Sequence, residues 1–165
     1  MFSWKTRVVV ALNVLSVASC LLCVEAACAE DAFCPDLQQV IDDAPNFHDL
    51  RGPHDSVPDM YVSKMEVPNG RCEIITRPPP PRHECVWMMT DEQKARATSK
   101  VMENAVQMCF GDSFLRSPMQ QKGSSSYAEK TSFTRTSDGL AITVVLRHYT
   151  TKDKCSVAVQ VESGN

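Results

Sequence analysis

The two segments that decide the fold lie near the end of the chain and read Leu140-Ala-Ile-Thr-Val-Val-Leu-Arg-His-Tyr149 and Cys155-Ser-Val-Ala-Val-Gln-Val-Glu162. In both, apolar side chains alternate with small or polar ones. A period of two residues is typical of antiparallel strands with one face buried and the other in water. The polar residues Thr151 to Lys154 between the two segments predict a turn.

Four further segments have the composition of strands: Met60 to Val67, Cys72 to Thr76, Glu84 to Met89 and Tyr127 to Thr136. The steps Asn69-Gly70 and Asp138-Gly139 suit tight turns. The run Pro78 to Pro81 predicts an extended spacer between strands, because proline has no N–H to donate to a sheet. The same run could instead serve as a polyproline ligand for an aromatic groove.

Two helices are predicted. In the first, from Cys34 to Ala44, apolar residues recur at helical spacing and Pro45 follows as a stop. The second opens with a capping box at Thr90 to Gln93 and ends at Gly111. Residues 46–59 are predicted to form a loop, and residues 112–126 a mobile connector.

These elements predict an α+β fold in which two helices pack on one face of an antiparallel sheet, in the order α-βββ-α-βββ. The order suggests a repeated unit of one helix and three strands, although the residues themselves show no self-similarity.

The N-terminus has the pattern of a secretory signal peptide. Two positive charges, Lys5 and Arg7, precede an apolar run from Val8 to Leu22 that is too short to span a membrane. Small residues permit cleavage after Ala26 or after Ala29. We therefore expect a signal peptide at residues 1–26 and a single α+β domain at residues 27–165, secreted or periplasmic and without a transmembrane anchor after processing. A lipoprotein carrying its lipid on Cys20 is the alternative.

Export would place the remaining cysteines in an oxidising compartment, where disulfides persist. Cys72 and Cys85 flank the connector between two predicted strands, so we expect them to pair. Cys34 opens one predicted helix and Cys109 closes the other, so we expect a second bridge there. Cys155 is then either a buried small side chain or a free, reactive thiol, and its pairing with Cys28 stays open.

The sequence predicts no catalytic residues, no metal site and no cofactor. Its 43% hydrophobic and 22% charged residues exclude a disordered tail. The six glycines form no nucleotide-binding motif, and no G-x-S-x-G nucleophile motif is present. Lys and Arg are scattered, which argues against nucleic acid as a partner. We expect no metal at His83-Glu84-Cys85, because consecutive strand residues face alternate sides.

Candidate binding residues are His48, Arg51 and His54 in the predicted loop, and Trp87. Arg51 with the two histidines could grip an anion, while a simply soluble loop is the alternative. Trp87 shares a strand face with Cys85, so it could pack on the disulfide instead of contacting a ligand.

The chain resembles small cysteine-containing proteins exported from bacteria. The resemblance is carried by Cys34 with Leu37, by Cys72 with Cys85 and Trp87, and by Cys109. It spans most of the expected mature chain and implies no known activity.

We therefore expect an exported, disulfide-stapled binding or accessory protein without catalytic activity, such as an inhibitor, an immunity factor or an envelope factor, whose partner is another protein. One alternative is a small secreted hydrolase or thiol-redox protein that uses Cys155 or the His48/His54 loop. A purely structural envelope component is the other.

Overall fold

The computed structural model describes residues 23–122, 126–149 and 154–164, and the chain divides into two units, Met1–Phe33 and Cys34–Asn165. In the first unit, residues 23–33 form the start of helix α1 (Cys23–Asp42). The predicted signal peptide lies mostly outside the described residues, as does Cys20. No helix in the described part of the chain combines the length and the apolar character needed to cross a membrane.

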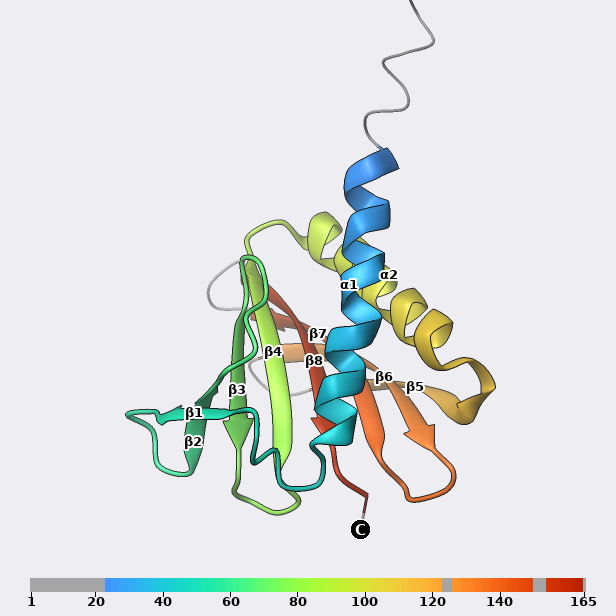
Figure 1. Cartoon of the computed structure of the whole chain (residues 1–165). Coiled ribbons are helices and arrows are strands. Elements are labelled where there is room, and N and C mark those ends of the chain that lie inside the picture. Colours follow the sequence, from blue (N-terminus) through green and yellow to red (C-terminus); the bar gives the residue numbers. More distant parts are fainter. Residues whose placement is uncertain (1–22, 123–125, 150–153, 165) are drawn as a thin grey trace, which may run out of the picture. The chain divides into compact units, whose positions relative to one another are not determined.

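The second unit is built on one antiparallel sheet of eight strands (Figure 1). Its strand order is β1-β2-β3-β4-β8-β7-β6-β5. The strands are β1 (Arg51–His54), β2 (Met60–Ser63), β3 (Arg71–Ile75), β4 (Arg82–Met89), β5 (Phe114–Lys122), β6 (Ser126–Arg135), β7 (Ala141–Tyr149) and β8 (Lys154–Glu162). Helix α2 (Glu92–Phe110) and the 3-10 turn η1 (Gly111–Ser113) connect β4 to β5.

The predicted α+β class with the order α-βββ-α-βββ is wrong. The described chain is mainly one antiparallel sheet, and each helix is followed by four strands. The two strands missing from the prediction are β1, in the predicted loop, and β5, in the predicted connector. Both are edge strands, and each contains a proline, Pro53 or Pro118. Proline is tolerated at a sheet edge, where an N–H can point away from the ladder, so here it does not mark a loop.

The helix boundaries also differ from the predicted ones. α1 begins well before Cys34 and contains Pro35. The N-cap of α2 is Asp91, whose carboxylate accepts a hydrogen bond from the Lys94 N–H at 2.8 Å, so the cap lies one residue later than predicted. The C-cap is Gly111, as predicted, with a positive φ of 53° that a side chain would disfavour.

The core lies where α2 covers β7 and β8. It includes the apolar rows of these strands, small residues of α2 and the last turns of α1, namely Ile142, Val144, Leu146, Val157, Val159, Val161, Ala95, Ala105, Val106, Leu37, Val40 and Ile41. The prediction that one face of β8 is in water is wrong, because Ser156, Ala158 and Gln160 are buried as well. β8 is a central strand between β4 and β7.

A charged cluster lies on this second face of the central strands. Glu84 is 7% exposed. Its carboxylate lies 2.8 Å from Arg147 Nη2 and 3.6 Å from Arg82 Nε. Arg147 belongs to β7 and Arg82 to β4, so the cluster spans β8 and ties the first half of the sheet to the second.

Candidate functional site

The four binding residues proposed from the sequence do not form one site. His48 lies before β1, and its side chain is 85% exposed. Arg51 and His54 lie at the two ends of β1. Trp87 lies on β4, where its indole N–H donates to the Pro68 carbonyl at 3.1 Å. Trp87 therefore holds the β2–β3 connection in place, and a side chain at Gly70 would clash with its ring.

Arg51 and His54 meet on Tyr61, a residue of β2 that the sequence did not single out. The Arg51 guanidinium lies 5.2 Å from the centre of the Tyr61 ring, and the His54 ring lies edge-on to it at 5.0 Å. The contacts depend on the pairing of β1 with β2, in which His54 lies opposite Tyr61. We call Arg51, His54 and Tyr61 the β1–β2 cluster. It lies at the edge of the sheet and combines cationic and aromatic side chains.

Cys155 is a free, buried thiol. Its Sγ lies 3.6 Å from His148 Nδ1, and the same nitrogen lies 3.9 Å from a Glu92 carboxylate oxygen. A cysteine next to a histidine can form a nucleophilic pair. Here, however, burial raises the pKa of the Cys155 thiol, and the nearby Glu92 carboxylate raises it further. Such surroundings favour the protonated thiol, which is the inert form.

Two disulfides join the cysteine pairs that we expected from the sequence. Cys34 is bonded to Cys109, which links α1 to the end of α2. Cys72 is bonded to Cys85 across the neighbouring strands β3 and β4, where the two residues lie directly opposite each other. Cys28 lies in α1, but its side chain is outside the described part, so its pairing stays open.

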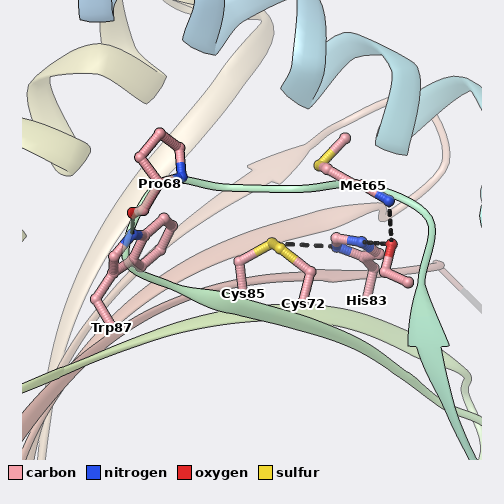
Figure 2. Close-up of a disulfide and its surroundings, with 7 residues drawn as sticks. Met65, Pro68, Cys72, His83, Cys85 and Trp87 are labelled. Atoms are coloured by element: carbon pink, nitrogen blue, oxygen red, sulfur yellow. Dashed lines mark hydrogen bonds between the residues drawn. A yellow bond between two sulfur atoms is a disulfide. The ribbon is translucent and has the colours of Figure 1, made fainter.

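The Cys72–Cys85 disulfide has a buried histidine beside it (Figure 2). His83 precedes Cys85 by two residues on β4, so both side chains point to the same face of the sheet. His83 Nδ1 lies 4.0 Å from Cys85 Sγ, and Nε2 lies 3.0 Å from Ser63 Oγ. We did not expect this arrangement from the sequence, because residues 83–85 were considered together as a consecutive trio. Side chains along a strand point to alternate faces, so Glu84 points away from its neighbours, while His83 and Cys85 point to the same face.

The hydrogen bonds around His83 favour one tautomer. Ser63 Oγ already accepts the Met65 N–H at 3.1 Å. Its own proton is then free to be donated to His83 Nε2, which places the imidazole proton on Nδ1, facing the sulfur of Cys85. Burial lowers the pKa of His83 to about 4, against the opposing field of Asp43. The imidazole is therefore neutral at physiological pH.

A surface pocket of about 330 Å³ opens next to the disulfide. It is lined by the end of β2, the β2–β3 connection and the start of β3, including Ser63, Met65 and Cys72. Cys72 and Cys85 themselves are only 4% and 6% exposed. The pocket therefore borders the disulfide on the Cys72 side, while both cysteines stay buried.

No family model matches the chain, and searches of curated proteins and of solved structures return no match.

Proposed function

We propose that this chain is an exported, disulfide-stabilised protein that acts by binding another protein, as an inhibitor, an immunity factor or an envelope factor would. The observation that carries the proposal is the β1–β2 cluster, which presents arginine, histidine and tyrosine side chains together at a sheet edge. Arginine and tyrosine are enriched among the residues that dominate protein–protein binding energy.

The composition of the cluster favours a partner segment with an acidic side chain. Arg51 can donate to a carboxylate, while the Tyr61 ring supplies apolar contact area. β1 itself is a poor template for adding a strand, because it is four residues long, contains Pro53 and has an irregular register with β2. Recognition would therefore depend on side chains.

Export is supported by the signal-like N-terminus and by the two disulfides, since such bonds persist mainly outside the cytosol. Intact mass of the non-reduced protein recovered from its native compartment tests this part of the proposal. We expect the mass of a chain that lacks residues 1–26 or 1–29 and is lighter by the four hydrogens of two disulfides. Recovery of the full-length, fully reduced chain would contradict export.

Binding is tested by capture from an extracytoplasmic extract with the disulfide-intact protein. We expect one partner in stoichiometric amount, and at least tenfold weaker capture with Tyr61→Ala. Leu115→Ala is the matched control, because Leu115 is 60% exposed on the opposite edge strand β5 and should leave capture unchanged. Absence of a stoichiometric partner, or equal capture by both variants, would refute the proposal.

The hydrolase or thiol-redox alternative has less support from the residues first considered for it. The Cys155 thiol is buried and its pKa is raised. The Nδ1 atoms of His48 and His54 lie next to the Asp49 carboxylate and the Asp55 carbonyl, and neither contact is with a serine or cysteine.

A further inference from the structure

We propose that Cys72, Cys85 and His83 form a redox-controlled zinc site, which is closed while the disulfide is intact and binds Zn²⁺ once the disulfide is reduced. The inference concerns a different part of the molecule from the β1–β2 cluster and does not depend on the proposed binding function.

The three residues place three metal-binding donor atoms close together. The two sulfurs and one imidazole nitrogen all lie within 4.8 Å of one another, and all three residues are buried. The strand register creates this arrangement, because Cys72 lies opposite Cys85 and His83 shares the face of Cys85. Two thiolates and an imidazole are ligands that zinc prefers.

The spacing is compatible with coordination. Zinc–sulfur and zinc–nitrogen bonds of about 2.3 and 2.0 Å in a tetrahedron place neighbouring ligand atoms about 3.5 to 3.8 Å apart. Cys85 Sγ already lies 4.0 Å from His83 Nδ1. Once the bond between the sulfurs is broken, the main movement required is their separation on two adjacent strands.

Ser63 provides the outer contact that a zinc-bound histidine needs. With Nδ1 bound to the ion, the imidazole proton lies on Nε2 and is donated to Ser63 Oγ, 3.0 Å away. Outer contacts of this kind fix the ring and its tautomer in metal sites. Zinc sites with two cysteines and one histidine take water or a small anion as the fourth ligand. The surface pocket lined by Cys72 and Ser63 is the nearest source of such a ligand.

The chemistry balances with a dithiol as the reductant. The dithiol transfers two electrons and two protons to the Cys72–Cys85 bond and becomes a disulfide itself. Zn²⁺ then displaces the two thiol protons. In reverse, an external disulfide oxidises the two zinc-bound thiolates, the Cys72–Cys85 bond forms again, the ion is released, and the external disulfide takes up two protons as two thiols.

The test uses the full chain with Cys20, Cys23 and Cys28 replaced by serine, so that these N-terminal thiols cannot hold metal. The protein is reduced with dithiothreitol, which is then removed under anaerobic conditions. The reduced protein is titrated with Zn²⁺ in competition with a chromophoric chelator. We expect one Zn²⁺ per chain by native mass spectrometry, none in the oxidised protein, and the visible bands of a tetrahedral thiolate site when Co²⁺ replaces zinc.

Variants separate this site from other thiols. Cys34→Ser with Cys109→Ser, and Cys155→Ser, should keep the zinc, while Cys72→Ser with Cys85→Ser should lose it. His83→Gln should weaken binding by more than about 100-fold, because it removes one of three protein ligands and even the loss of an outer contact costs about 10- to 100-fold. Three results would overturn the proposal: no stoichiometric zinc on the reduced chain, unchanged binding after loss of Cys72 and Cys85, or unchanged affinity in His83→Gln. A reduced chain that shows no sheet signal by far-UV circular dichroism with zinc present would overturn it too.

Discussion

At the scale of single residues, the buried imidazole of His83 makes stability depend on pH. Burial lowers the pKa of His83 to about 4 in the folded protein, against an ordinary value of 6.5. Between these two values the unfolded chain binds more protons than the folded one, so the free energy of unfolding falls as the pH falls. We expect a loss of about 3 kcal/mol between pH 7 and pH 4, measured by urea unfolding.

His83→Gln is the control for this pH dependence. Glutamine keeps a polar group near Ser63 but does not titrate. The free energy of unfolding of the variant should therefore change little between pH 7 and pH 4. The pKa values of Asp55 and Asp138 are also lowered, by hydrogen bonds from Ser56 and Arg135 respectively, but those carboxylates lose their contribution only below about pH 4. Equal slopes for the two proteins between pH 4 and pH 6.5 would contradict the assignment to His83.

Cys155 gives a second prediction at this scale. The thiol is buried and its pKa is raised by burial, so little thiolate is present or accessible. We expect iodoacetamide at pH 8 to label Cys155 at least tenfold more slowly in the native protein than in urea. Mass spectrometry of the peptide that contains Cys155 measures this without interference from other thiols. Fast labelling of the native protein would restore the interpretation of Cys155 as a reactive residue.

At the scale of elements, the two disulfides should contribute unequally to stability. Cys34–Cys109 closes a loop with a sequence separation of 75, and Cys72–Cys85 one of 13. In the chain-entropy model these loops correspond to about 4 and about 3 kcal/mol. We therefore expect Cys34→Ser with Cys109→Ser to lower Tm more than Cys72→Ser with Cys85→Ser in calorimetry. The reverse order would mean that local packing around His83 outweighs loop entropy.

The elements that the sequence predicted well are those in which burial and periodicity agree. β7 alternates over its first half, although Val145 on the second face is buried as well, and six of the eight described strands fall within predicted strand segments or overlap them. The strands β1 and β5 were not predicted, because their prolines, Pro53 and Pro118, indicate a loop in the sequence. At the edge of a sheet, however, proline is tolerated. An edge position is a property of the whole topology, so no local pattern reveals it.

The candidate sites show the same limit. Both disulfide pairs follow from the positions of cysteines relative to predicted elements. The contact of His83 with Cys85 also had a signal, because the two residues are two positions apart, but His83 lies just before the predicted strand that begins at Glu84 and is part of β4 only in the structure. No sequence signal pointed to Tyr61. Its contacts with Arg51 and His54 depend on the pairing of β1 with β2, and β1 was not predicted as a strand.

At the scale of the whole molecule, the described elements form two halves, each with one α-helix followed by four strands. α1 precedes the meander β1 to β4, α2 precedes the meander β5 to β8, and the last strands of the halves, β4 and β8, pair at the centre of the sheet. Eight consecutive residue pairs join these two strands, from Arg82 with Glu162 to Met89 with Cys155. The halves therefore share one sheet and should unfold together.

Glu84 offers the sharpest test of that coupling, because it is nearly buried and its carboxylate pairs with Arg82 in one half and Arg147 in the other. Glu84→Ala leaves two half-buried arginines without their partner, and we expect a loss of about 2 kcal/mol, less than for fully buried pairs because both arginines reach some solvent. Glu73→Ala is the matched control, since Glu73 pairs with Arg71 inside the first half alone and should cost less than about 1 kcal/mol. Urea unfolding followed by tryptophan fluorescence and by far-UV circular dichroism should give a single, coincident transition that shifts as a whole in Glu84→Ala. Two separated transitions would mean that the halves are independent and that the pairing of β4 with β8 does not couple them.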